Sequence, residues 1–323
     1  MTTTQTILTT LDDEFTGTAD NETIIGLGGN DYINGQKGDD IIKGGAGNDE
    51  LDGGLGNDNA FGGEGDDTIF GRAGDDELKG ESGDDYLNGG RGDDIVKAGE
   101  GNDEAVGGAG DDSIYGYTGD DILKGHSGDD YIEGGAGADT LKGGKGNDTL
   151  IADEDDVFVG GGKGFDTVTV NDSDGDGVVD VDFTDPNMRS IEAIIGDGQD
   201  RGDTVNATVN LNKIMFQSQD DGDAATPDTD NTFIAVGIDS LIIEANKRWL
   251  DDGEMSMTST DLDSAAEAEY LQMVGITDSV DLFSYTFTKS TGQTVSIVTD
   301  LTIDEIFDSR DNESLADLVP DVV

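Results

Sequence analysis

The sequence has no cysteine, three prolines, one histidine and one tryptophan among its 323 residues. The absence of cysteine excludes disulfide bridges and metal sites built from thiolates. Because His126 is the only histidine, a Cys–His pair is impossible and a Ser–His–Asp triad would depend on this one residue. The motifs H-E-x-x-H and G-x-S-x-G are also missing, so we expect that the chain is not an enzyme.

Basic residues and long apolar runs are scarce as well. Seventeen Lys and Arg stand against 74 Asp and Glu, which gives a net charge of −57 and an isoelectric point near 4.1. Nucleic acids and anionic membranes bind proteins through Lys and Arg, so this composition argues against both as partners. No run approaches the roughly 18 apolar residues of a membrane-spanning helix. The partners that such a charge favours are cations.

Glycine, in contrast, is abundant, and it recurs within a nine-residue unit. Fourteen units follow one another from Gly26 to Ile151 without an insertion or a deletion. In every unit the fourth residue is Gly, the sixth is Asp and the eighth is apolar, in the pattern G-G-x-G-x-D-x-U-x, where U is apolar. A degenerate unit, 17–25, precedes the run, while a broken unit, 152–160, and a last recognisable unit, 161–169, follow it. Self-similarity at a short period predicts a stacked repeat architecture.

Each unit predicts a turn of small and polar residues followed by a very short strand. Two units then make one coil of a solenoid, with the apolar eighth residues of both sides inside and glycine supplying backbone conformations with positive φ. Neighbouring coils stack about 4.8 Å apart, as strands do in a sheet. Sixth-position Asp residues that lie two units apart therefore form a ladder along each edge of the solenoid.

These two ladders point to a metal ion. Two carboxylates about 5 Å apart repel each other by roughly 3 kcal/mol at an effective dielectric constant of 20, and one apolar residue in nine cannot offset that repulsion. Calcium accepts carboxylate and carbonyl oxygens more readily than magnesium, which holds its water, and a set of oxygen donors argues against zinc and copper. The sequence therefore predicts calcium-dependent folding. The predicted ligands are Asp31, Asp40, Asp49, Asp58, Asp67, Asp76, Asp85, Asp94, Asp103, Asp112, Asp121, Asp130, Asp139, Asp148 and Asp166.

Over residues 17–169 the repeat resembles the RTX (repeats-in-toxin) family of secreted proteins. The resemblance implies a parallel β-roll that holds about a dozen calcium ions between successive turns on the same edge. It also implies type I secretion from a Gram-negative bacterium, which uses an uncleaved C-terminal signal. The N-terminal segment, Met1–Phe15, agrees with this route, because it lacks the basic start and the apolar run of a Sec signal peptide.

The segments on either side of the repeat differ from it in composition. Residues 1–16 are interpreted as a leader that caps the first coil. Beyond residue 170, alternating Val and Ile predict a smaller β-rich domain over 170–300, followed by a C-terminal tail, 301–323, as the candidate secretion signal. Strands are predicted at 204–211, 232–236, 241–243, 282–287 and 295–298, and short helices at 263–274, 302–307 and 312–319.

A second candidate calcium site follows the repeat. Its spacing, D-x-D-x-D-G-x-x-D, resembles the calcium loops of the EF-hand and thrombospondin type. The twelfth position is Phe183 rather than Glu and no flanking helices are evident, so it is not a complete EF-hand. A plain acidic turn is the alternative. The candidate ligands are Asp172, Asp174, Asp176 and Asp180.

Together these features favour a secreted calcium-binding structural protein that self-assembles into a surface layer, matrix or filament. Apolar residues at the outward ninth position offer contacts to another copy of the chain or to matrix components. Two alternatives stay open: an adhesin that binds carbohydrate or another ligand through residues 170–300, and an enzyme with an unrecognised carboxylate site. The apolar ninth residues are Phe61, Phe70, Val106, Tyr115 and Ile151.

Overall fold

The structure, a computed structural model, describes residues 4–153 and 155–171 and, beyond these, the backbone of strands β20 to β30. Side chains are described up to residue 169. The chain divides into two compact units, Met1–Gly164 and Phe165–Val323. The described part of the chain contains strands and turns only, and so no helix there is long and apolar enough to cross a membrane.

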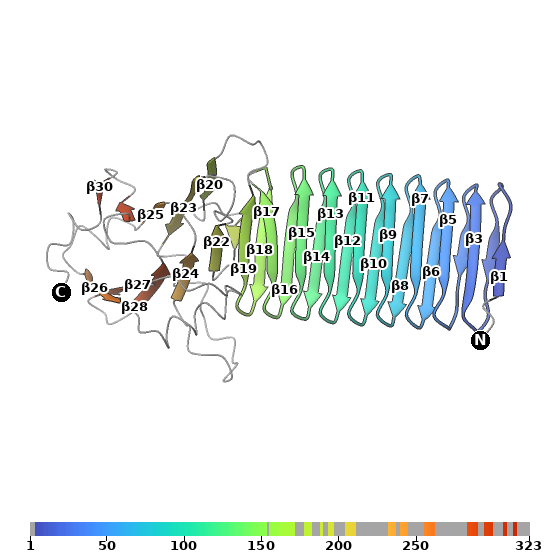
Figure 1. The fold of residues 1–323 in the computed structure, drawn as a ribbon, viewed down its shortest axis with the longest axis horizontal. Helices are drawn as coiled ribbons and strands as arrows, with labels where there is room; N and C mark the ends of the chain where they lie inside the picture. Colours follow the sequence, from blue (N-terminus) through green and yellow to red (C-terminus); the bar gives the residue numbers. More distant parts are fainter. Residues whose placement is uncertain are drawn as a thin grey trace. The chain divides into compact units, whose positions relative to one another are not determined.

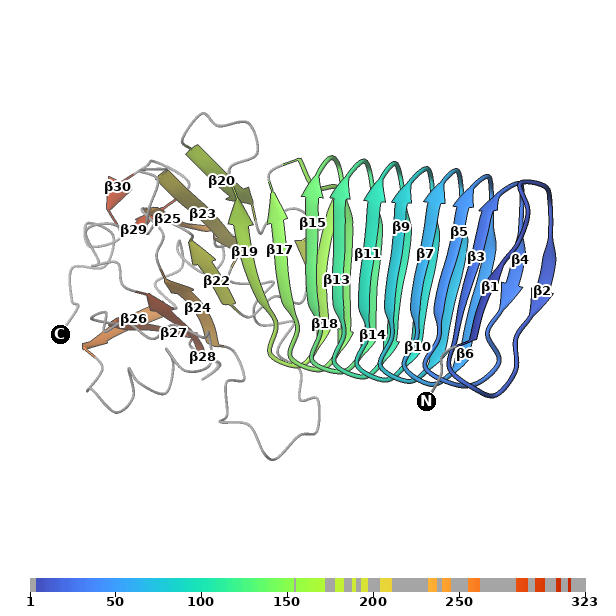
Figure 2. The same ribbon diagram turned by 45° about the vertical axis from the view of Figure 1, so that its right-hand side comes forward.

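The first unit is a solenoid of two parallel sheets, as Figure 1 shows. The chain changes sheet after every nine-residue unit, so odd-numbered strands form one sheet and even-numbered strands the other. Within a sheet each residue pairs with the one 18 positions later, so that Ile24 lies opposite Ile42 and Ile42 opposite Ala60. The turns that join the sheets line up along two edges of the solenoid (Figure 2). The predicted all-β fold, a parallel β-roll of two units per coil, is confirmed.

The strands of the roll are short and uniform. The odd-numbered sheet contains β1 (Thr4–Ile7), β3 (Glu22–Gly28), β5 (Ile41–Ala46), β7 (Asn59–Glu64), β9 (Glu77–Ser82), β11 (Ile95–Glu100), β13 (Ser113–Thr118), β15 (Tyr131–Ala136) and β17 (Thr149–Asp153). The even-numbered sheet contains β2 (Glu14–Thr16), β4 (Tyr32–Asn34), β6 (Glu50–Leu55), β8 (Thr68–Ala73), β10 (Tyr86–Arg91), β12 (Glu104–Ala109), β14 (Ile122–Ser127), β16 (Thr140–Lys145) and β18 (Phe158–Lys163).

The core of the roll is a single file of side chains from each sheet. The eighth residue of every unit, from Ile24 to Val168, is fully or almost fully buried. The seventh and ninth residues point outward, because side chains alternate between the faces of a strand. One buried side chain in nine makes a thin core, so the coils also depend on backbone hydrogen bonds between them and on the chemistry of the turns.

The N-terminal segment that the sequence sets apart as a leader contains two strands of the roll. Strand β1 pairs in parallel with β3, with Ile7 opposite Ile25, and β2 pairs with β4. Ile7 and Leu11 remain 59% and 71% exposed, so their side chains do not cap the core. These residues extend both sheets by one more coil.

The strands of the second unit follow two hydrogen-bonded orders. One runs in the order β19-β22-β24-β28-β27-β26 and the other in the order β20-β23-β25-β29-β30. Most neighbours are parallel, but β26, β27 and β28 form an antiparallel meander. The strands are β19 (Thr167–Asn171), β20 (Val178–Asp182), β21 (Met188–Arg189), β22 (Ala193–Gly196), β23 (Thr204–Asn210), β24 (Thr232–Val236), β25 (Ser240–Glu244), β26 (Met255–Asp261), β27 (Phe283–Lys289), β28 (Thr294–Thr299), β29 (Ile306–Asp308) and β30 (Glu313–Ser314).

Sequence and structure agree on five strands of this unit, while others such as β26 were not predicted, and they differ on two helices. All five predicted strands occur, as β23, β24, β25, β27 and β28. The helices predicted over 302–307 and 312–319 are wrong where the structure describes these segments, because Ile306–Asp308 and Glu313–Ser314 are strands. Pairing of β29 with β25 and β30 overrides the local helical preference. The helix predicted over 263–274 lies outside the described residues.

Candidate metal centre

The sixth-position aspartates of the fourteen intact units lie at the turns, and all are buried. Their exposed fraction is 3% or less, as is that of Asp166 in the last unit. Ionised carboxylates are almost never this buried unless they are paired or bind a metal. From Asp31 to Asp139 none of these aspartates belongs to an ion pair of the described residues, because the four pairs there involve Asp52, Glu77 and Glu104 instead.

One oxygen of each carboxylate belongs to a hydrogen-bonded ladder. The backbone N–H of Asp31 donates to Oδ1 of Asp49 (2.8 Å), and Asp49 donates in the same way to Asp67 (2.8 Å). The other edge repeats this arrangement, for example from Asp40 to Asp58 (2.8 Å). These bonds fix every carboxylate relative to the next coil, 18 residues further on, as the sequence predicted for two ladders.

The second oxygen of the carboxylates has no donor. From Asp31 to Asp139, Oδ2 of each sixth-position aspartate is buried without a hydrogen-bond partner. A buried polar atom of this kind costs about 1–3 kcal/mol, and more when it is charged. The same oxygen without a donor recurs on every turn from Asp31 to Asp139, which indicates a ligand rather than an isolated irregularity.

The first residue is glycine in thirteen of the fourteen intact units, and it leaves room beside this oxygen. A Cβ atom built on Gly35 would lie 2.5 Å from Oδ2 of Asp40 and 2.7 Å from the carbonyl oxygen of Gly53 in the next coil. Carboxylate and carbonyl oxygens therefore converge on one small space that any side chain would fill. The backbone there has no positive φ, so it is this close approach that requires glycine at the first position.

Such a donor set fits calcium. Calcium binds carboxylate and carbonyl oxygens in a flexible geometry, so one aspartate per coil combined with main-chain carbonyls suffices. No three acidic or imidazole side chains gather at one point within the described residues, so a site made of side chains alone is not formed there. The absence of sulfur and imidazole donors at the turns argues against zinc and copper.

Burial also raises the pKa of these carboxyl groups. Loss of hydration is the largest cause; the N–H bond within the ladder lowers the pKa in part, and carboxylates of neighbouring coils raise it again. The pKa reaches about 6 at Asp49, about 7 at Asp67 and about 8 at Asp130. At neutral pH the turns therefore hold protons or need a bound cation.

Comparison with known families agrees with this geometry. Overlapping stretches of the chain match the RTX calcium-binding nonapeptide repeat (4 copies), at residues 16–51, 25–60, 61–96, 97–132, 124–159 and 133–168. The repeats of this chain are RTX repeats. No curated protein matches the chain. The resemblance seen in the sequence is thereby confirmed for the β-roll, and calcium is its ion.

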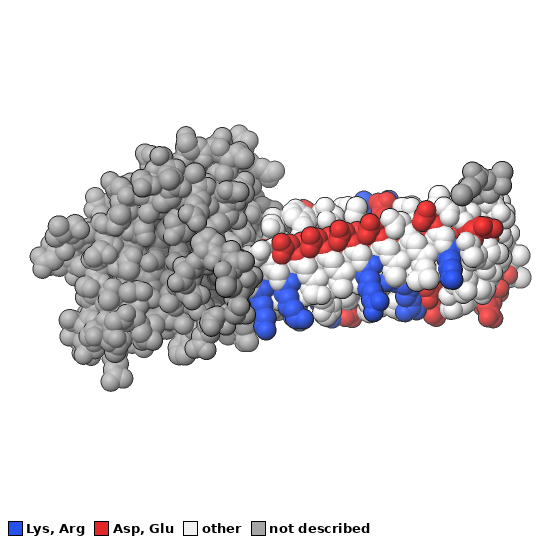
Figure 3. Space-filling model, turned by 90° about the horizontal axis from the view of Figure 1, so that it is seen from below, with Lys and Arg blue, Asp and Glu red and all other residues white. Residues whose placement is uncertain are grey.

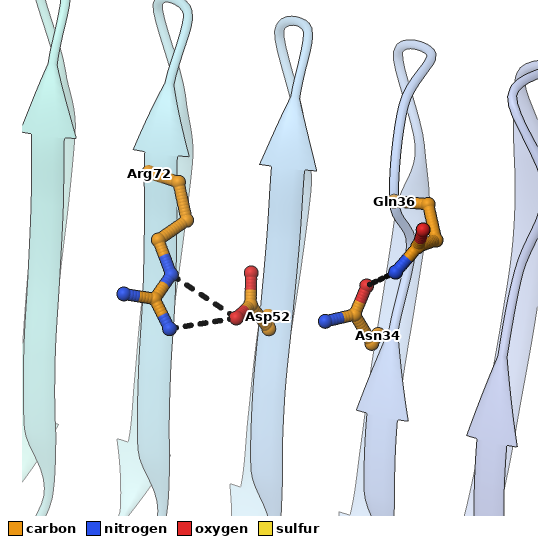
Figure 4. A network of polar contacts seen from close by, with 4 residues as sticks. All are labelled: Asn34, Gln36, Asp52 and Arg72. Carbon is orange, nitrogen blue, oxygen red and sulfur yellow. Dashed lines mark hydrogen bonds and ion pairs between the residues drawn. The ribbon is translucent and has the colours of Figure 1, made fainter.

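The second residue of each RTX unit has a positive φ whether or not it is glycine. Eight units have Gly there, but Leu27, Gln36, Arg72, Glu81, Tyr117 and His126 occupy it in the other six, with φ between 77° and 83°. For a residue other than glycine this conformation costs about 1–2 kcal/mol. Figure 4 shows two of these side chains on the outer surface, where Arg72 donates twice to Asp52 (2.7 and 3.0 Å) and Gln36 donates to Asn34 (2.9 Å).

We expect His126→Gly to stabilise the calcium-loaded roll by about 1 kcal/mol, because glycine adopts positive φ without strain. The converse variant at the same position of the next coil, Gly144→Ala, should destabilise it, since its Cβ would also collide with the carbonyl oxygen of His126. Thermal unfolding in saturating calcium measures both effects. An unchanged or lower midpoint for His126→Gly would contradict the strain argument.

Sequence reasoning missed one irregular unit. Residue 98 is the first residue of the unit that carries Asp103, and it is Ala where the other intact units have Gly. Ala98 is fully buried. At the same position of the other units a built Cβ would lie 2.1–2.5 Å from Oδ2 of the unit's own aspartate, so the methyl group of Ala98 is expected to take up this space. The signal was present in the sequence, but its meaning depends on the close approach that only the structure shows. The calcium site at Asp103 is therefore expected to be crowded.

Removing this methyl group tests that expectation. Ala98→Gly should raise the calcium affinity of the weakest site by about tenfold, or about 1.4 kcal/mol. Gly80→Ala, one coil earlier on the same edge, should lower affinity, because its Cβ would meet Oδ2 of Asp85 and the carbonyl oxygen of Ala98. Calorimetric titration with calcium compares the two variants with the wild type. Identical titration curves for all three would show that the first position is not critical.

The ladder continues through the broken unit, in spite of its missing aspartate. Val157 holds the sixth position, where the sequence predicted a lost ligand, and its side chain is 53% exposed. The neighbouring Asp156 takes over the hydrogen bond, and its Oδ1 accepts the backbone N–H of Asp139 (3.1 Å).

The second candidate calcium site lies largely outside the described residues. This holds for Asp172, Asp174 and Asp176, while of Asp180 only the backbone, in β20, is described.

A second row of polar side chains runs along each edge, one residue before the buried ladder. These fifth-position residues are exposed, and their side chains accept N–H bonds from the next coil, as Asp75 does from Asp93 (3.1 Å) and Asp93 from Asp111 (2.9 Å). Figure 3 shows a row of acidic side chains along the roll, with Lys and Arg side chains beside it. Water can hydrate exposed carboxylates, so the buried row is the candidate metal centre.

Proposed function

We propose that this chain is a secreted structural protein that folds on extracellular calcium and then assembles with copies of itself into a surface layer, matrix or filament. The RTX β-roll supplies the calcium dependence. A chain unfolded at the low calcium level of the cytosol passes through a type I channel of a Gram-negative bacterium and folds in the millimolar calcium outside. Calcium also offsets the negative charge that otherwise keeps copies apart.

The observation that carries the assembly step is a partly exposed group on the odd-numbered sheet, here called the tyrosine patch. It consists of Tyr115, Tyr117 and Tyr131 together with Ile95 on the neighbouring strand β11. The ring of Tyr115 lies 6.2 Å from that of Tyr117 and 5.7 Å from that of Tyr131. Ile95 is 41% exposed and Tyr117 50% exposed. Tyr117 holds a strained positive φ between two glycines, Gly99 and Gly135, of the neighbouring strands. A large exposed side chain at a position that favours glycine supports a role in contacts.

The other apolar ninth residues are less available for contacts. Phe61 lies between the ammonium groups of Lys43 and Lys79, 5.2 and 4.8 Å from its ring centre. Phe70 packs against Arg72 and Tyr86, Val106 is buried and Ile151 is half-buried. Within the roll, the tyrosine patch is therefore the strongest candidate for the surface between copies.

The test is light scattering and electron microscopy on the full-length protein with and without calcium. The wild type should form ordered polymers on calcium addition, and the triple variant Tyr115→Ser, Tyr117→Gly, Tyr131→Thr should stay monomeric although it folds. A matched control on the even-numbered sheet, Leu55→Thr with Ile122→Thr, should polymerise normally. A wild type that remains a folded monomer in calcium and binds glycans would refute assembly and favour the adhesin. If the triple variant forms polymers, the tyrosine patch is not the surface between copies.

A further inference from the structure

The carboxylates along the edges of the roll are of two kinds, which differ in the partner of their second oxygen. We call a carboxylate open when this oxygen is buried without a hydrogen-bond donor. All sixth-position aspartates from Asp31 to Asp139 are open. We call it closed when the second oxygen accepts the backbone N–H of the second residue of its own unit.

Among the residues that the structure describes, three carboxylates are seen to be closed, and these three lie in the degenerate units that flank the regular repeat. The N–H of Thr9 donates to Oδ2 of Asp13 (2.8 Å), and that of Thr18 donates to Oε2 of Glu22 (2.8 Å). At the other end the N–H of Asp153 donates to Oδ2 of Asp156 (2.9 Å). Hydroxyl groups strengthen the first two, because Thr9 Oγ1 and Thr18 Oγ1 also donate to these carboxylates.

The closed groups terminate the ladders. On one edge the N–H of Asp13 donates to Asp31 (2.9 Å) at the start, and the N–H of Asp139 donates to Asp156 (3.1 Å) at the end. On the other edge the N–H of Glu22 donates to Asp40 (2.8 Å) at the start. The series of open carboxylates thus begins directly after a closed one on both edges.

The backbone of the second residue separates the two kinds. In all fourteen regular units its φ is positive, including the six units in which it is not glycine. At Thr9, Thr18 and Asp153, whose N–H groups bind the carboxylate, φ is not positive. Side chains other than glycine disfavour positive φ, so residues such as Glu81 would relax if the turn allowed it. In the regular units a positive φ at the second residue accompanies an Oδ2 without a donor. We therefore infer that the strained conformation is kept because it directs the N–H of the second residue away from Oδ2.

We propose that the φ of the second residue decides whether a turn binds calcium, and that Asp13, Glu22 and Asp156 are metal-free ends of the two ladders. Their oxygens already have protein donors, so calcium would have to displace N–H bonds. Two of these units also lack the glycine that leaves room for a cation, since Leu8 and Ala152 hold its position. This inference rests on calcium binding by the open carboxylates. The ends close the stack with protein groups alone, as terminal repeats must.

The test counts bound calcium per full-length chain by equilibrium dialysis and atomic absorption. Asp67→Asn, at an open position, should bind at least one ion fewer than the wild type. Asp13→Asn and Asp156→Asn, on the same edge, should bind as many ions as the wild type. Far-UV circular dichroism in saturating calcium verifies that each variant is folded. A folded Asp13→Asn or Asp156→Asn protein that loses an ion, as Asp67→Asn does, would overturn the proposal.

A variant that gains a calcium ion provides a second test of the proposal. The triple variant Thr18→Gly, Asp20→Gly, Glu22→Asp converts unit 17–25 into the regular pattern and should add one calcium ion. The count should stay at the wild-type value for Thr18→Ala, which keeps the N–H and the closed state. A folded triple variant with no additional ion would contradict the role of the second residue. If the wild type itself binds no calcium, the assignment of the repeat fails instead, so the two failures are distinguishable.

Discussion

In calcium-free buffer at pH 7.5, the β-roll is expected to lose its β-sheet signal in far-UV circular dichroism and to regain it cooperatively when calcium is added. The open carboxylates are stacked one coil apart, and each adjacent ionised pair is unfavourable by roughly 3 kcal/mol. The core offers one buried apolar side chain in nine residues to oppose this repulsion. Because the unfolded chain separates the charges, metal-free folding is disfavoured over the whole repeat.

Magnesium provides the control for this result. At equal concentration it should restore little of the signal, since it keeps its water shell and does not adapt to one carboxylate and several carbonyl oxygens. Sodium chloride at 1 M should restore part of the signal at most, because buried pairs are screened poorly. A protein that is fully folded in chelator at this pH, or that folds equally well with magnesium, would contradict calcium as the structural ion of the roll.

Much of the metal centre followed from the sequence because its chemistry is local and repeated. A strict nine-residue period fixes two units per coil, and this register alone places Asp31 below Asp49 and Asp40 below Asp58. The apolar eighth position likewise predicts a core that the structure confirms. An insertion or a deletion in any unit would have broken the period, so an uninterrupted run of fourteen units supports the register.

The features that the sequence did not reveal depend on contacts between coils or on tertiary pairing. The crowding at Ala98 follows from the approach of a carboxylate and a carbonyl oxygen. In the broken unit, Asp156 accepts the ladder hydrogen bond because Val157 holds the sixth position, and this turn does not follow the regular pattern. Strand β29 forms in a segment with helical preference because β25 offers it a pairing edge. Local patterns do not report interactions of this kind.

Acid should substitute for calcium. When calcium-stripped protein is titrated from pH 8 to pH 5, the β-sheet signal is expected to return, with a midpoint between about pH 6 and 7. The buried carboxyl groups have pKa values from about 6 at Asp49 to about 8 at Asp130, against 3.8 when unperturbed. The folded state thus binds protons more tightly than the unfolded state, and protonation favours folding.

The direction of this pH effect on folding, and the pH range over which it acts, follow from these pKa values. Above about pH 8 both states are ionised and the metal-free roll carries its full repulsion. As the pH falls through the folded-state values, protons remove this repulsion, and the gain is complete only near pH 4, where the unfolded chain also takes up protons. With calcium present the same protons compete for the ligands, so calcium affinity should fall over the same range.

A neutral substitution sharpens the experiment. Asp130→Asn removes the carboxylate with the highest of these pKa values and should move the metal-free folding midpoint to higher pH, while it also removes a proposed calcium ligand. Asp93→Asn makes the same change, one carboxylate oxygen to an amide nitrogen, at an exposed fifth-position residue. It should leave the pH midpoint of metal-free folding unchanged. Circular dichroism against pH, in matched calcium-free buffers, measures all three proteins. A chain that stays unfolded down to pH 5 without metal would show that charge repulsion between the ladders is not what keeps the roll open.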